Sequence, residues 1–403
     1  MSRELLAKPG LYSHLRRHGR LAGRAGLLAL LLLGGMAGAE LQPEPLVRQD
    51  LPATGSAHWV WVNDLVFQHM VDGKAFLFDG DSGNMLGMLS TGFGFGAVVI
   101  PRDRSVIAAP ETYLSRGTRG TRTDVVTLYD PRTLDPIGEI VIPPKRASSM
   151  PMRASAALTD DDRFLLIYNF TPAQTVTVVD LRARNFVGEV DTPGCALVYP
   201  TGPRSFFSLC GDGTALTVRL DEAGDVIARE RTPRLFDSEQ DPVTEKAVRD
   251  GDTWLFDSFA GDIVPVETVN GHTHAGARWS LTTAEERKAG WKPGGLQHLA
   301  LHAGSRRLYS LMHQGGPDSH KDPGSEVWVY DLGTRERTQR IALEAPLMSI
   351  AVTGDDEPLL FGVFIGAPEL RVFDARKGTA LRTIREVGLT PTILVTYEPG
   401  SPP

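Results

Sequence analysis

Cysteine is scarce in this chain of 403 residues, which contains only Cys195 and Cys210. If the two form a disulfide, neither thiol is available to bind a metal ion. Glycine, proline and an apolar stretch separate them, as expected for two neighbouring strands joined by a turn. A disulfide can span that geometry. In an oxidising compartment, a chain with two thiols is expected to form one bridge.

Long hydrophobic runs are also lacking. The apolar run at residues 25–33 is too short for a membrane span, which needs about 20 residues. It follows a basic segment and precedes Ala37-Gly-Ala39, the arrangement of a secretory signal with an A-x-A cleavage site. We therefore predict a cleaved signal peptide over 1–39, with a retained membrane anchor as the alternative. The Arg16-Arg17 pair is compatible with export by either the Sec or the twin-arginine pathway.

Positive charge is not in excess. The chain has 42 Lys and Arg against 49 Asp and Glu, for a formal net charge of −7. Residues 1–39 contain six of the basic residues and one of the acidic ones, which leaves 36 against 48, or about −12. Nucleic-acid binding needs an excess of basic side chains to neutralise phosphates. This composition argues against it.

Familiar catalytic motifs are missing too. There is no G-x-S-x-G or H-E-x-x-H sequence, and the glycine-rich stretch 91–97 lacks the lysine and helix of a phosphate loop. We interpret that stretch as a flexible loop between strands. Ten histidines raise the question of a metal site, but they lack convergent carboxylates. We interpret them as surface and turn residues; those considered are His272, His274, His298, His302, His313 and His320.

A repeated strand pattern is present instead. Apolar residues alternate along a short run that ends at an acidic residue, and a turn and a second β-rich run follow. Clear copies end at Asp79, Asp130, Asp180, Asp331 and Asp374, and weaker copies end at Asp221 and Glu267. Seven repeats of about 40–65 residues predict an all-β fold, a seven-bladed β-propeller. A β-sandwich or several small β domains would not readily give this even spacing.

The repeats set the predicted domains. We expect a proline-rich extended arm at 40–57, which alternatively supplies the strand that closes the ring, then the propeller at 58–398 and a disordered tail at 399–403. Helix is nearly absent. One short helix is predicted within 280–290, where Thr283 and Glu286 form a capping box.

A basic stretch precedes the second clear repeat. Arg116, Arg119 and Arg122 follow one another at intervals of three residues in a predicted loop. They can bind an anionic surface. Alternatively, Arg122 and Asp124 brace adjacent blades through charge-assisted hydrogen bonds. The second interpretation is slightly favoured.

Several segments, in the same order along nearly the whole mature chain, resemble the heavy (large) subunit of the quinoprotein amine dehydrogenases, the methylamine and aromatic amine types. The matching segments are 86–93, 112–126, 143–147, Cys195 to Gly213, 290–295 and 320–331. Two of them, 143–147 and the segment before Asp331, look closer to the aromatic amine type.

This resemblance implies a periplasmic α2β2 heterotetramer of two heavy and two light subunits. In that family the light subunit carries tryptophan tryptophylquinone and the catalytic base, and it oxidises primary amines to aldehyde and ammonia. Electrons pass to a blue copper protein of the azurin or amicyanin type. No catalytic, cofactor-binding or metal-binding residue is then expected on this chain.

Two positions carry over from the family. They are the Cys195–Cys210 disulfide and Phe93, the aromatic that lines the substrate channel. A plain core or interface phenylalanine is the alternative for Phe93, whose glycine-rich context departs from the family. An aromatic on such a loop can select substrates by size.

The alternative hypothesis assigns the chain to a different class of function. The chain would then be a stand-alone periplasmic propeller, either a binding scaffold or a lactonase-like metal-dependent hydrolase. Acidic and asparagine side chains lining the central channel would favour it.

Overall fold

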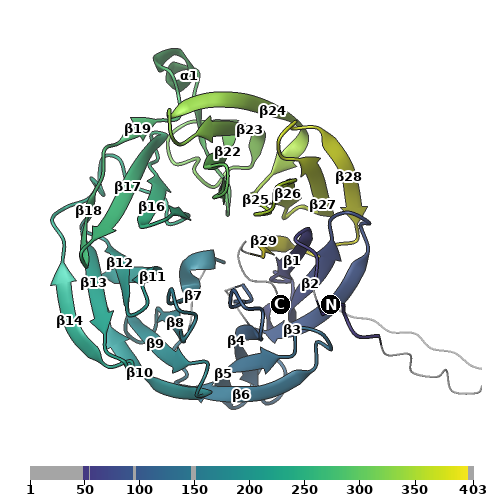
Figure 1. The fold of residues 1–403 in the computed structure, drawn as a ribbon, viewed down its shortest axis with the longest axis vertical. Helices are drawn as coiled ribbons and strands as arrows, with labels where there is room; N and C mark the ends of the chain where they lie inside the picture. Colours follow the sequence, from purple (N-terminus) through teal and green to yellow (C-terminus); the bar gives the residue numbers. More distant parts are fainter. Residues whose placement is uncertain (1–48, 54, 94–96, 147–150, 398–403) are drawn as a thin grey trace, which may run out of the picture. The chain divides into compact units, whose positions relative to one another are not determined.

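The computed structural model describes residues 49–53, 55–93, 97–146 and 151–397. Their strands form seven sheets arranged in a ring, which confirms the seven-bladed propeller (Figure 1). The predicted signal peptide 1–39, residues 40–48 of the predicted arm and the tail 399–403 lie outside the described residues. Within the described part of the chain, no helix is both long and apolar enough to span a membrane.

The strands of each blade run from the centre of the ring outward. Blade 1 contains β29 (Pro391–Thr396), β1 (Trp59–Asp64), β2 (Gly73–Asp79) and β3 (Met85–Gly92). Blade 2 contains β4 (Ile107–Leu114), β5 (Arg122–Tyr129) and β6 (Pro136–Ile142). A single bridge between Val99 and Ala108 takes the innermost position, so β4 and β5 count as the second and third strands of this blade. Blade 3 contains β7 (Ala156–Leu158), β8 (Phe164–Asn169), β9 (Thr175–Asp180) and β10 (Asn185–Asp191). Blade 4 contains β11 (Cys195–Gly202), β12 (Ser205–Cys210), β13 (Ala215–Leu220) and β14 (Val226–Arg231).

The remaining blades follow the same order with small additions. Blade 5 contains β15 (Val248–Asp250), β16 (Thr253–Asp257), β17 (Asp262–Val269) and β18 (His272–Ala275), and β19 (Trp279–Ser280) also pairs with β17. Blade 6 contains β20 (Trp291–Pro293) and β21 (Leu299–His302), both paired with β22 (Arg307–Gln314), then β23 (Gly324–Asp331) and β24 (Glu336–Leu347). Blade 7 contains β25 (Ser349–Val352), β26 (Leu359–Phe364), β27 (Ala367–Asp374) and β28 (Ala380–Arg385). Two short 3-10 helices are η1 (Met70–Asp72) and η2 (Arg153–Ser155).

The repeated acidic residues occupy one structural position in six blades. Each lies at the end of the third strand or directly after it, and accepts a backbone N–H from the following turn; Asp130, for example, accepts from Arg132 at 2.8 Å and Thr133 at 2.9 Å. Glu267 is the exception, because it lies inside β17. The turn after β17 is formed by Asn270 and Gly271, both with positive φ, so no carboxylate is needed there. The predicted role of Glu267 in a turn is therefore wrong.

Burial explains why the blades stack around a ring. Every residue of β1 is buried, because neighbouring blades cover both faces of that strand. The outer strand β24 alternates between buried or half-buried and exposed residues, since it faces solvent on one side. Trp61 and Trp328 are fully buried and are the largest side chains of the inter-blade core. The core thus lies between blades and not within any single sheet.

The ring is closed by the last strand of the chain. β29 pairs with β1 in antiparallel register, with Val60 opposite Thr396 and Val62 opposite Leu394. The alternative that 40–57 supplies the closing strand is therefore wrong. Its described residues form no strand, and Leu51 instead packs against blade 1 and donates its N–H to the Arg132 carbonyl at 2.9 Å.

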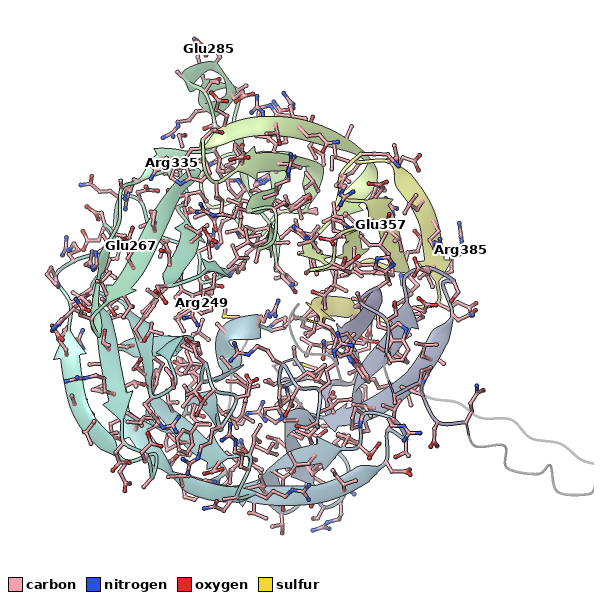
Figure 2. All side chains as sticks on the ribbon, in the orientation of Figure 1. Arg249, Glu267, Glu285, Arg335, Glu357 and Arg385 are labelled. Atoms are coloured by element: carbon pink, nitrogen blue, oxygen red, sulfur yellow. A yellow bond between two sulfur atoms is a disulfide. The ribbon has the colours of Figure 1, made fainter. Side chains whose placement is uncertain are left out.

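The one α-helix of the described residues is α1 (Ala284–Lys288), which projects from the rim of the ring between β19 and β20 (Figure 1). The predicted capping box is confirmed. The Thr283 hydroxyl accepts from the Glu286 N–H at 3.2 Å, and the Glu286 carboxylate accepts from the Thr283 N–H at 3.0 Å. In Figure 2, Glu285 of α1 lies outside the ring, whereas Arg249 of β15 lies near its inner edge.

His58 bridges the two blades that meet at the closure. Its Nδ1 lies 2.8 Å from the Asp81 carboxylate of blade 1, and its Nε2 lies 3.0 Å from Asp355 in blade 7. Burial lowers the pKa of His58, but the two carboxylates outweigh it and leave the pKa raised. The protonated imidazole therefore stabilises the seam.

A pH dependence of stability follows from His58. The native state binds the proton more tightly than the unfolded chain, so the contribution is full below the ordinary pKa of about 6.5 and is lost as pH rises through the raised value. We expect His58→Gln to lower the free energy of unfolding by about 0.5 kcal/mol in acid and by less at alkaline pH. Urea unfolding across this range measures the difference. His272→Gln, at an exposed histidine beside Glu230, is the control; an equal pH-dependent loss in it would contradict the assignment.

Candidate functional site

Antiparallel connectivity divides the loops of the ring between two faces. The connections from second to third strand, and from each outer strand to the next blade, emerge on the same side. We call this side the Phe93 face, because Phe93 directly follows the outer strand β3. It includes the connections 65–72, 115–121, 170–174 and 386–390.

Phe93 is half-buried at the junction of blades 1 and 2. Its backbone N–H donates to the Thr112 carbonyl of β4 at 2.9 Å. The preceding Gly92 has φ +53°, and a Cβ there would lie 2.9 Å from Cε1 of Tyr113. Only glycine therefore fits between Phe93 and the tyrosine ring. Residues 94–96 of the predicted flexible loop lie outside the described residues.

Exposed apolar side chains gather on this same face. Phe67, Tyr113, Phe170 and Leu389 are 36%, 37%, 53% and 62% exposed. These include all the large aromatic side chains that are exposed in the described part of the chain; the other large exposed apolar residues lie on outer strands or at the end of β17. The exposed aromatic side chains of the described residues therefore all lie on one side of the ring.

Asp64 holds two of these apolar residues in place. Its buried carboxylate accepts from the N–H groups of Val66 at 2.9 Å, Leu389 at 2.5 Å and Thr390 at 2.9 Å. The Thr390 hydroxyl in turn accepts from the Phe67 N–H at 3.1 Å. The loops bearing Phe67 and Leu389 are thus fixed to one another before any partner binds.

A fully buried acid, Glu111 of β4, directly precedes Thr112, whose carbonyl accepts the Phe93 N–H. Its Oε2 accepts from the hydroxyls of Tyr113 at 2.6 Å and Thr127 at 2.5 Å, and its Oε1 is 3.3 Å from the Tyr129 hydroxyl. Burial raises the pKa of Glu111 to about 7, although the three hydroxyls and Arg146 oppose the shift. Sequence inspection did not single out Glu111, because it occupies a buried position within an ordinary strand.

The basic stretch divides into two parts. Arg122 pairs with the buried Asp124 through two hydrogen bonds of 2.7 Å, and it also donates to the Arg146 carbonyl. Both residues lie within β5, and Arg122 joins that strand to the connection after β6. The prediction that the pair braces adjacent blades is therefore wrong. Arg116 and Arg119 are exposed in the connection 115–121 on the Phe93 face.

Cys195 and Cys210 are joined in a disulfide. They lie directly opposite each other in the β11–β12 pair, inside blade 4. Both are buried and belong to blade 4, whereas Phe93 lies at the junction of blades 1 and 2. The bond is a local link between two adjacent strands.

The histidines are less exposed than expected. His298, His302 and His313 are buried, so the prediction that they lie on the surface is wrong. His298 places Nε2 2.8 Å from Asp257, a residue 41 positions away that local sequence patterns cannot connect to it. Among the residues that the structure describes, no group of three or more histidine, cysteine, aspartate or glutamate side chains is arranged to hold a metal ion.

Fold and surface together define a seven-bladed propeller whose exposed aromatic side chains, among the described residues, lie on one face. The sequence model of the methylamine dehydrogenase heavy chain family matches residues 56–398. The chain belongs to that family.

Individual relatives agree with the family assignment. The chain is 31% identical to the methylamine dehydrogenase heavy chain of Methylophilus methylotrophus, with 93% of this chain and 95% of the relative covered. It is 34% identical to the heavy chain of Paracoccus versutus, with 81% and 77% covered. Both relatives carry the methylamine name.

Solved structures support the fold alone. A Desulfotomaculum acetoxidans protein of unknown function aligns with a TM-score of 0.57 at 14% identity, covering 85% of this chain and 100% of that protein. Dihydro-heme d1 dehydrogenase aligns with a TM-score of 0.53 at 17% identity, covering 86% of this chain and 68% of that one. Such distant likenesses carry no argument about activity.

Proposed function

We propose that this chain is the large subunit of a periplasmic amine dehydrogenase, in an α2β2 complex with a light subunit. The light subunit supplies the tryptophan tryptophylquinone and the catalytic base, and this chain binds the light subunit and walls the substrate channel. The observation that carries the proposal is the family membership combined with the apolar Phe93 face.

The overall reaction is the oxidation of a primary amine. R–CH2–NH2 and water give R–CHO, NH3, two protons and two electrons. A quinone held by the light subunit would supply the two-electron oxidant, and a blue copper protein would be the final acceptor. The role of this chain is to admit the amine and exclude solvent. Phe93, at the junction of two blades, is the residue proposed to line the channel.

The Phe93 face suits an obligate partner. Its exposed apolar residues include the aromatic side chains of Phe67, Tyr113 and Phe170, and aromatic side chains are enriched at interfaces. Asp64 fixes the loops of Phe67 and Leu389 in advance, which lowers the entropy lost on association. The exposed Arg116 and Arg119 add positive charge to the same face, which favours an acidic partner surface.

Charged substitutions on this face should break the complex. We expect Phe170→Asp and Leu389→Asp each to weaken association with the co-expressed light subunit more than tenfold, because a buried apolar anchor is replaced by an unpaired charge. Analytical ultracentrifugation of the purified complexes measures the loss. Ile227→Asp is the matched control, since Ile227 is 63% exposed on the outer strand β14. If Ile227→Asp dissociates the complex and the two face variants do not, the light subunit binds elsewhere.

The same purified material tests two alternatives. An amine panel with dye reduction distinguishes methylamine, named in the relatives, from the aromatic amines suggested by 143–147 and the segment before Asp331. The stand-alone or lactonase-like propeller would require activity, or metal binding, without a light subunit. No cluster of metal ligands in the described part of the chain favours it.

A further inference from the structure

The strand end that carries Phe93 is held from two sides by tyrosines. On one side the Tyr113 ring lies against Gly92, and the neighbouring Thr112 carbonyl accepts the Phe93 N–H. On the other side the Tyr129 hydroxyl lies 2.7 Å from the carbonyl of Ser90, three residues before Phe93. The Tyr129 bond crosses from blade 2 to blade 1.

Both tyrosines meet at one carboxyl group. Glu111 Oε2 accepts from Tyr113 at 2.6 Å, and Glu111 Oε1 lies 3.3 Å from Tyr129. Burial, and then the nearby Glu111, raise the pKa of both tyrosines, so both remain protonated hydroxyls. Glu111 is therefore the group of this cluster that changes protonation near neutral pH.

Counting hydrogens gives the two states of this cluster. A tyrosine hydroxyl has one hydrogen, so Tyr129 donates either to Ser90 or to Glu111. When Glu111 is neutral, its Oε1–H can donate to the Tyr129 oxygen while Tyr129 donates to Ser90, and every group is satisfied. When Glu111 is ionised, Oε1 competes for the Tyr129 hydrogen, and the Ser90 bond weakens.

We propose that Glu111 is a positioning residue for Phe93, acting through Tyr113 and Tyr129, so that its loss of a proton loosens the strand end bearing the channel aromatic. This rests on the proposed role of Phe93 in an amine dehydrogenase. The neutral state holds the aromatic in the narrower channel, and the ionised state relaxes the selection against bulky amines.

The surrounding charges are few. Arg146 on the connection after β6 is buried and favours the ionised form of Glu111; burial lowers its own pKa to about 10. The carboxylate of Asp124, which is paired with Arg122, favours the protonated form of Arg146 and so opposes that lowering of its pKa. The negative charge of Glu139 in β6 further raises the pKa of Tyr113 and Tyr129. Among the described residues, no other charged group is a main cause of the shift in the pKa of Glu111.

The test uses the complete heavy–light complex and two alkylamines of similar basicity, one short and one branched. In the wild type, the ratio of kcat/KM for the branched amine to that for the short one should rise about three- to tenfold as pH increases through about 7, the scale of one hydrogen bond. Glu111→Gln mimics the neutral acid and should keep the low-pH ratio throughout. Tyr129→Phe should keep the high-pH ratio. Tyr309→Phe, which removes a buried hydroxyl bonded to the Ala375 carbonyl in another blade, should retain the wild-type step.

A second readout is independent of activity. With a fluorinated phenylalanine at position 93, the 19F chemical shift of the complex should titrate near pH 7 in the wild type and stay constant in Glu111→Gln. A shift that does not titrate, or that still titrates in Glu111→Gln, overturns the positioning role. A shift that titrates as expected in a complex that oxidises no amine overturns the proposed function alone.

Discussion

Phe93→Ala should raise kcat/KM for bulky primary amines relative to methylamine by tenfold or more. The side chain is half-buried at the junction of blades 1 and 2, and its removal opens space that the aromatic ring otherwise fills. A difference of one methylene group in a hydrophobic pocket is worth about 10- to 200-fold in selectivity. Steady-state kinetics of the heavy–light complex over a series of amines of increasing size measures the change.

Phe259→Ala is the matched control for this substitution. Phe259 is also half-buried on the Phe93 face, where it stacks on His320 with ring centroids 3.9 Å apart, but it belongs to blade 5. Its loss should leave the ratio among amines unchanged. An intact complex of Phe93→Ala with wild-type selectivity would show that Phe93 is an ordinary interface residue.

The double substitution Cys195→Ala with Cys210→Ala should lower the free energy of unfolding by about 3 kcal/mol. The bond closes a loop of 15 residues, and in the chain-entropy account a loop of that size restricts the unfolded state by about this amount. Urea unfolding under oxidising conditions measures the loss. The wild type should lose similar stability when reduced, and its mass should increase by two hydrogens.

The double variant provides its own control, because added reductant has no bond to break in it. A wild type whose unfolding is insensitive to complete reduction would contradict the stabilising role. Amine selectivity should not change in either case, since the disulfide lies in blade 4, away from Phe93.

The sequence predicted those features that depend on neighbouring residues. Alternating strands ending in aspartate locate the third strand of six blades, because the carboxylate bonds the turn that immediately follows. Thr283 and Glu286 form the capping box for the same reason. The prediction fails at Glu267 because Asn270 and Gly271 make a turn that needs no carboxylate. The acidic residue there lies inside β17 and not at its end.

Features built from distant residues were missed. The sequence offers 40–57 only as an alternative source of the closing strand, whereas β29 supplies it, and Asn63 of β1 donates to the carbonyl of Ile393, 330 residues away. Glu111 and His298 lie among apolar neighbours, and their partners come from other strands, such as Asp257 for His298. Nothing in the local pattern marks such a residue as buried and ionisable. The position of Phe93 came from the family resemblance and not from periodicity.

The pairing of β29 with β1 also determines the order in which the molecule can be completed. Blade 1 lacks its innermost strand until residues 391–396 have been synthesised, so the edge of β1 stays unpaired while the other six blades are made. An unpaired strand edge readily pairs with other chains. A chain that stops short of Pro391 would therefore lose more than its last strand. It would leave the ring open and expose the inner edge of β1, which β29 covers in the closed ring.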